Sequence, residues 1–89
     1  MIIHLKTVCP EIIGRIPNGE YIVRDGATAQ QALCQCLESK GMSVPKEEQL
    51  TNLLYVVNHH QEKSDIVIND GDRLMVLRPV RGGDRKSVV

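Results

Sequence analysis

Aromatic side chains are almost absent from this sequence: of its 89 residues two are tyrosine, and none is tryptophan or phenylalanine. Proteins bind single-stranded nucleic acids largely by stacking the bases on aromatic rings. The formal net charge is also zero, because 11 lysine and arginine residues balance 11 aspartate and glutamate residues. Without stacking platforms or an overall positive charge, the sequence argues against nucleic acid as a partner.

Long apolar runs and paired cysteines are lacking too. No run approaches the length of a membrane-spanning helix, and polar residues interrupt the start of the chain at His4 and Lys6. We therefore expect no membrane association and no signal peptide. Three cysteines, an odd number, argue against a disulfide framework and favour a reducing compartment. These features predict a cytoplasmic protein.

What is present is the composition of an ordinary soluble domain, with 42% hydrophobic and 25% charged residues. A chain of this length forms one small domain, in which a deep cleft is hard to build. No Ser-His-Asp or paired-carboxylate arrangement stands out, and His59-His60 has no third ligand nearby to form a metal site. We expect no catalysis by the chain alone, no bound cofactor and no metal.

A helix beginning after Thr28 is the element with the clearest signal. Thr28 and Gln31 have the spacing of a capping box, and Gly41 is a natural C-terminal cap. Between them, apolar residues recur at helical spacing and form one stripe: Ala29, Ala32, Leu33, Cys36 and Leu37. Cys34 lies off this stripe, and Cys9 is expected in an exposed loop.

Four segments have the composition of β-strands: residues 2–8, 20–24, 53–57 and 73–78. The first two form an antiparallel hairpin with a long connection. Residues 66–68 are expected as a short strand or an extended crossing, 42–52 as a loop with room for one short helical turn, and 58–61 and 69–72 as turns. This order predicts an α+β fold, a mixed sheet of four to five strands with the last strand central and one main helix on one face.

The last strand has apolar residues in succession from Leu74 to Leu77. Alternation sends two of them to each face of the sheet. We expect Leu74 and Val76 to face the helix, and Met75 and Leu77 to lie on the open face with Arg73. An uncovered apolar patch usually marks a partner surface, so we predict one made of Arg73, Met75, Leu77 and Arg78. Pro79 stops the strand, and residues 80–89 have no periodicity.

The final third of the chain resembles the ubiquitin-like β-grasp sulfur carriers of the molybdopterin synthase small subunit and ThiS type. The matching residues are Val57-Asn58, Asp70-Gly71-Asp72, the apolar strand, and Arg78-Pro79-Val80-Arg81-Gly82-Gly83. The resemblance implies a β-grasp domain over residues 1–81 and a flexible tail over 82–89. It also implies that an E1-like enzyme uses ATP to adenylate the carboxylate of Gly83, and that a sulfurtransferase or cysteine desulfurase provides the sulfur of a thiocarboxylate. A synthase large subunit is then a further partner, in molybdenum cofactor or related biosynthesis.

Residues 79–83 of the tail fit this chemistry, whereas residues 84–89 do not. Pro79, Val80, Arg81 and Gly82 would thread a narrow channel in the partner, where the missing Cβ atoms of the glycines let the backbone lie close to the walls. However, Gly83 is followed by residues 84–89, so its carbonyl is part of an amide bond. Either a protease removes these residues, or they are foreign to the natural protein, or the chain is not a carrier.

Two other functions remain open at this stage. The chain is either a β-grasp binding module that docks through its open sheet face, or a ubiquitin-like modifier whose Gly83 is joined to lysine. The sequence does not select among the sulfur pathways, which include molybdenum or tungsten cofactor, thiamin, and cysteine or other sulfur metabolites.

Overall fold

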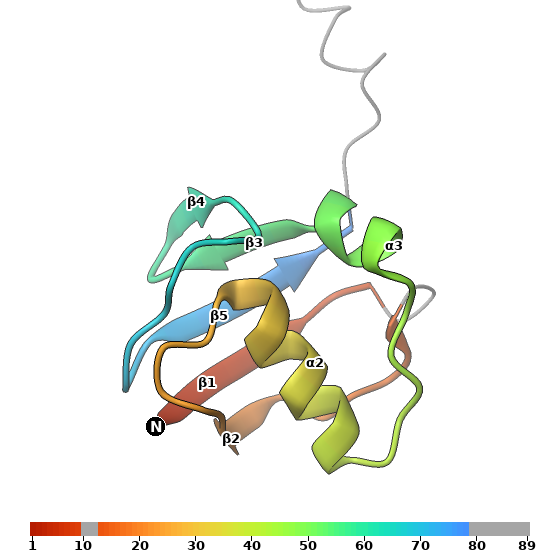
Figure 1. The fold of residues 1–89 in the computed structure, drawn as a ribbon, viewed down its shortest axis with the longest axis horizontal. Coiled ribbons are helices and arrows are strands. Elements are labelled where there is room, and N and C mark those ends of the chain that lie inside the picture. The colour runs from red at the N-terminus through yellow and green to blue at the C-terminus, as the bar shows by residue number, and fades with distance from the viewer. Residues whose placement is uncertain (10–12, 79–89) are drawn as a thin grey trace, which may run out of the picture.

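A mixed five-stranded sheet organises the fold, and helix α2 lies across one of its faces (Figure 1). The computed structural model describes residues 1–9 and 13–78. The sheet order is β2-β1-β5-β3-β4, so β5 is central, parallel to β1 and antiparallel to β3. The expected α+β architecture with the last strand in the middle is confirmed. The strands are β1 (Ile2–Thr7), β2 (Gly19–Ile22), β3 (Leu54–Val57), β4 (His60–Glu62) and β5 (Arg73–Leu77).

Helix α2 (Ala29–Ser39) begins with the capping box that the sequence predicts. The backbone N–H of Gln31 donates to Thr28 Oγ1 at 3.2 Å, and the Gln31 side chain accepts from the Thr28 N–H at 3.1 Å. The helix is followed by Gly41 at a φ of +67°, a left-handed conformation that glycine adopts at little cost. All five residues of the predicted stripe are buried, so the stripe packs against the sheet.

We expect Thr28→Ala to lower the free energy of unfolding by about 1 kcal/mol, because it removes the hydroxyl that satisfies a helix N-terminal amide. Thr28→Ser keeps a hydroxyl in the same place and is the matched control, expected close to wild type. Urea unfolding of the three proteins measures the difference. An equal loss in both variants would show that the hydroxyl is not the stabilising group.

The core lies between α2 and the face of the sheet that α2 covers. Tyr55 is fully buried there, and its hydroxyl donates to the carbonyl of Leu50 at 2.6 Å. Leu50 belongs to α3 (Glu47–Asn52), the short helical turn for which the sequence left room. Cys9 is also fully buried and joins the same core cluster, with its sulfur 3.9 Å from the carbonyl oxygen of Val76. The expectation that Cys9 lies in an exposed loop is therefore wrong.

The fourth strand begins within the segment expected as a turn, and of the two alternatives for residues 66–68 the extended crossing is the one observed. It is β4, which pairs with β3, whereas residues 66–68 form one isolated bridge between Val67 and Thr28. Asn58 and His59 both have positive φ, 52° and 72°, as a tight type I′ turn between antiparallel strands requires. The predicted turn at 58–61 is thus tighter than expected, and the chain already pairs again at His60.

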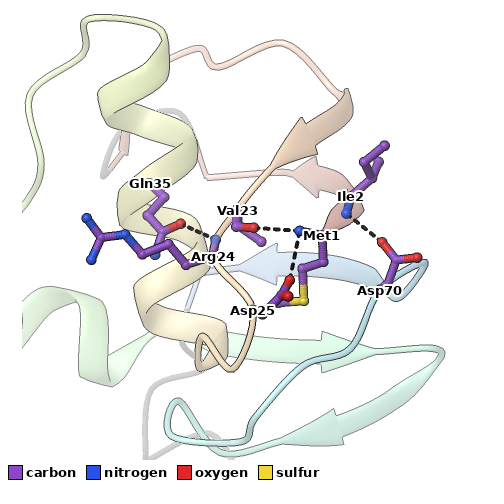
Figure 2. A network of polar contacts seen from close by, with 7 residues as sticks. All are labelled: Met1, Ile2, Val23, Arg24, Asp25, Gln35 and Asp70. Atoms are coloured by element: carbon purple, nitrogen blue, oxygen red, sulfur yellow. Dashed lines mark hydrogen bonds and ion pairs between the residues drawn. The ribbon is translucent and has the colours of Figure 1, made fainter.

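Polar contacts hold the start of β1 against its neighbours (Figure 2). The amino group of Met1 donates to the carbonyl of Val23 at 2.9 Å and lies 3.0 Å from Asp25 Oδ1. The N–H of Ile2 donates to Asp70 Oδ1 at 2.7 Å. The segment after β2 and the turn before β5 are therefore both tied to the first residues of β1, which fixes the ends of the three strands relative to one another.

No helix in the described part of the chain is long and apolar enough to cross a membrane.

Candidate functional site

The face of the sheet opposite α2 is the candidate docking surface. Along β5, Leu74 and Val76 face the helix and are buried, with 1% and 0% of their surface exposed to solvent. On the opposite face, Met75 and Leu77 are half-buried and Arg73 is exposed. The predicted division of the strand between its two faces is confirmed. Arg78 follows the strand and is exposed.

Strand pairing adds two residues that the sequence analysis did not assign to this face. In the register of β3 and β5, Val56 lies beside Met75 and Leu54 beside Leu77. Both are half-buried, and together these four side chains form the apolar patch. Alternation within residues 53–57 could have suggested Leu54 and Val56, but only the register places them next to β5.

Beside the apolar patch the open face is hollowed into a shallow depression of about 330 Å³. Its floor includes the patch residues Val56 and Met75. Its rim includes four basic side chains, which we call the basic rim: His4, Lys6, His59 and Arg73. His4 and Lys6 come from β1, where they lie in register with Arg73 and Met75.

The motif Asp70-Gly71-Asp72 has a structural role, as the sequence predicts. Gly71 has a φ of +85°, and Asp72 Oδ2 accepts from the N–H of Asn69 at 2.7 Å. Asn58, which follows the neighbouring strand β3, also contacts this turn. Its Nδ2 donates to Asp72 Oδ1 at 2.9 Å, and its Oδ1 accepts from the N–H of Arg73 at 3.0 Å. The motif thereby locks the register of β3 against β5, and with it the arrangement of the apolar patch.

The thiols of α2 are unsuited to nucleophilic chemistry. Burial raises the pKa of Cys36 to about 12, and burial and the nearby Glu38 raise the pKa of Cys34. Both thiols are therefore protonated at neutral pH, and the thiolate is the nucleophile. None of the three cysteines, all of which lie in the described part of the chain, forms a disulfide bond. Within residues 1–9 and 13–78 no group of histidine, cysteine and carboxylate side chains could hold a metal ion.

The residues predicted to carry the chemistry, Gly83 and the threading segment Pro79, Val80, Arg81 and Gly82, lie outside the described residues, as does the predicted domain boundary at residue 81. The described chain ends at Arg78, directly after β5. Because Leu77 pairs with Leu54, the chain leaves the sheet at the edge of the apolar patch.

Comparison with solved structures identifies the fold as the ubiquitin-like β-grasp. The crystal structure of SAMP1 from Haloferax volcanii superimposes with a TM-score of 0.58 at 20% sequence identity, covering 93% of this chain and 100% of SAMP1. No protein-family model matches the sequence. The search of curated proteins found no match either. The likeness to SAMP1 confirms the predicted fold class.

Proposed function

We propose that this chain is a ubiquitin-like sulfur carrier that works through the C-terminal carboxylate of Gly83, after removal of residues 84–89. The observation that supports the proposal is a β-grasp fold whose central strand is followed, after Arg78, by the sequence Pro79-Val80-Arg81-Gly82-Gly83. The chain itself is then a protein substrate and not an enzyme.

The chemistry divides between the carrier and its partners. A carboxylate is a poor electrophile, so the E1-like enzyme joins it to AMP: a carboxylate oxygen attacks the α-phosphorus of ATP and pyrophosphate leaves. A persulfide sulfur on a sulfurtransferase or cysteine desulfurase then attacks the acyl carbon and AMP leaves, which gives an acyl disulfide. A thiolate of the partner enzyme attacks the donor's sulfur in this S–S bond, so that the thiocarboxylate leaves and the thiolate and the donor are joined in a disulfide. An acceptor such as a synthase large subunit takes the sulfur for molybdenum cofactor or related biosynthesis.

The apolar patch supports the proposal as a candidate place for the enzyme to bind. Gly83 is five residues beyond Arg78, which limits its reach to about 17 Å from Arg78. An enzyme that holds the apolar patch must therefore have its nucleotide site within this distance of Arg78. Glycines at the last two positions remove the Cβ atoms that a narrow channel would exclude.

A second candidate function is a protein modifier, in which a lysine amine attacks the activated carbonyl of Gly83, displaces AMP or the enzyme thiol of a thioester, and forms an isopeptide bond. The fold shared with SAMP1, a ubiquitin-like small archaeal modifier, favours this alternative. Both candidates need the same adenylation, and the product separates them. If Gly83 is never activated, the chain is a binding module that docks through its sheet face.

The experiment that tests the proposal uses the chain ending at Gly83 and the E1-like enzyme from the same genome. The two are incubated with ATP and a sulfide source, and the intact mass of the small protein is measured. The proposal requires replacement of one oxygen by sulfur at the C-terminus. An adenylate that yields only lysine conjugates in cell extract would support the modifier instead.

For the docking surface we expect Leu77→Ser to weaken binding to the E1-like enzyme while costing only about 1 kcal/mol of stability. Full burial of a leucine contributes about 1.5–3 kcal/mol, and Leu77 is only half-buried. Its neighbour Val76 is fully buried, so Val76→Ser is the control that destabilises the fold instead. Urea unfolding and calorimetric titration measure both effects. A large stability loss in Leu77→Ser, with affinity kept in the folded fraction, would show that Leu77 belongs to the core.

A further inference from the structure

Strand β2 is one edge of the sheet, and its outer side has no neighbouring strand among the described residues. Antiparallel strands exchange hydrogen bonds at every second residue. The N–H of Val23 donates to the carbonyl of Met1 at 2.9 Å, so the backbone groups of Tyr21 also point toward β1. The backbone groups of Glu20 and Ile22 therefore point away from the sheet. An edge of this kind is a template for the addition of another strand.

The side chain of Gln35 marks the point at which this open edge ends. The backbone N–H of Arg24 also points away from β1, and Gln35 Oε1 accepts its hydrogen bond at 2.7 Å (Figure 2). The amide of Gln35, which belongs to α2, thus stands where the carbonyl of an added strand would lie. The open part of the edge is short, and Ile22 is its last residue before this bond.

The side chains along the edge are complementary to a second copy of themselves. Ile22 is 79% exposed, and its partner in register on β1, Ile2, is 45% exposed. Glu20 lies two residues before Ile22, and Arg24 lies two residues after it. When two copies pair antiparallel with Ile22 opposite Ile22, Glu20 of each copy lies opposite Arg24 of the other. Opposite charges and branched apolar side chains are the cross-strand pairs that stabilise a sheet.

Both charged side chains are available for this pairing. Arg24 is exposed beside α2, and its side chain forms no ion pair within residues 1–9 and 13–78. Glu20 is also exposed, and its Oε2 lies 3.7 Å from His4 Nε2, a contact that leaves the carboxylate room for a second partner. Neither side chain has to break an interaction inside the fold to meet the other copy.

The neighbouring antiparallel registers are less favourable. A pairing centred on Glu20 would place two carboxylates opposite each other, and like charges in that position are destabilising. A pairing centred on Tyr21 would place Glu20 opposite the apolar Ile22. The charges and the exposed isoleucine therefore select one register, with Ile22 at its centre.

We propose that two copies of this chain pair antiparallel through their β2 edges, with Ile22 opposite Ile22 and Glu20 of each copy opposite Arg24 of the other. The pairing joins two five-stranded sheets into one, and Ile2 and Ile22 of both copies form an apolar row across the junction. β1 separates β2 from β5, so the apolar patch on β3 and β5 stays accessible in the dimer. Because β2 has only four residues, the contact is small and the dimer dissociates on dilution.

Exchange of the two charges tests the pairing. Glu20→Arg places arginines opposite each other at both ends of the junction, and Arg24→Glu places glutamates there. We expect each variant alone to raise the dissociation constant of the dimer by roughly tenfold or more. An equimolar mixture of the two should dimerise again, because the arginines of one variant then face the glutamates of the other. Sedimentation velocity over a range of concentrations measures the three samples and the wild type.

The matched control is Glu48→Arg, which makes the same change in net charge at an exposed position on α3. Its dissociation constant should stay within about twofold of the wild-type value. Equal urea unfolding midpoints show that all variants are folded. A wild-type chain that stays monomeric at every concentration would overturn the proposal. So would a mixture of Glu20→Arg and Arg24→Glu that dimerises no better than its components.

Amide hydrogen exchange, followed by NMR on the wild-type chain, locates the contact. In the dimer the N–H of Ile22 donates to the carbonyl of Ile22 in the second copy, so its exchange should slow as the protein concentration rises. The N–H of Tyr21 already points toward β1 and is the internal control, whose exchange should change little. Concentration-dependent protection confined to β4 would place the contact at the other edge and overturn the assignment. Neither experiment uses Gly83 or an activating enzyme, so failure of the dimer and failure of the carrier function are distinguishable.

Discussion

Leu33→Ala is expected to lower the free energy of unfolding by about 2–5 kcal/mol, the usual cost of truncating a leucine in a packed core. Leu33 is fully buried on the face of α2 that packs against the sheet. Its loss removes apolar burial and leaves a cavity that the surrounding side chains fill only in part. Because small domains are typically stable by only about 5–15 kcal/mol, the variant should be close to the limit of folding.

The matched control is Glu38→Ala, an exposed substitution on the same helix. It should stay within about 0.5 kcal/mol of wild type, since surface changes rarely exceed that. Urea unfolding followed by circular dichroism compares the three proteins. A Leu33→Ala midpoint equal to that of Glu38→Ala would show that this face of α2 is not packed as described.

The elements with a strong local signal could be predicted from the sequence. The capping box at Thr28 and the apolar stripe of α2 depend only on neighbouring residues, and the structure agrees with them. The alternation in β5 likewise assigns Leu74 and Val76 to the helix side, because two-residue periodicity divides any strand between two faces.

Features that depend on contacts between distant segments could not be predicted from local sequence pattern. The segment at β4 is polar and lacks the apolar alternation of a buried strand, because it is a short edge strand held by its pairing with β3. Cys9 follows the first strand and precedes a proline, which favours a loop, but tertiary packing buries its side chain. Local pattern does not report the burial of a residue outside regular structure.

In the candidate site too, some residues could be predicted from local pattern, and others are brought together only by strand pairing. Met75 and Leu77 could be predicted because they share one strand, whereas Leu54 and Val56 join them through the register of β3 and β5. In the basic rim, His4 and Lys6 lie near Arg73 because β1 pairs in parallel with β5. Arg73 is far from both of them in the sequence. The sequence contains these residues but no local signal that they meet.

The largest effect is expected from the position at which the chain ends. The chain stopped after Gly83 should be adenylated and thiocarboxylated, and the full-length chain should not. In the full-length protein the Gly83 carbonyl belongs to an amide, so it offers no carboxylate to ATP. In a chain stopped after Val89 the terminal carboxylate belongs to Val89, preceded by Val88, and branched side chains would not follow glycines into a narrow channel.

A chain stopped after Gly82 is the matched control, because it has a free glycine carboxylate one residue earlier. Its carboxylate falls about 3.3–3.6 Å short of the nucleotide, and misplacement by 1 Å can cost on the order of a hundredfold in rate. The three forms are incubated with the E1-like enzyme, ATP and sulfide, and intact mass is followed over time. Their unfolding midpoints are compared to show that each is folded.

Equal modification of the full-length chain would mean that residues 84–89 do not block the reaction, and processing would be unnecessary. If no form is modified while the enzyme is active on its own carrier, the chain acts as a binding module, and its open sheet face is then the site to pursue.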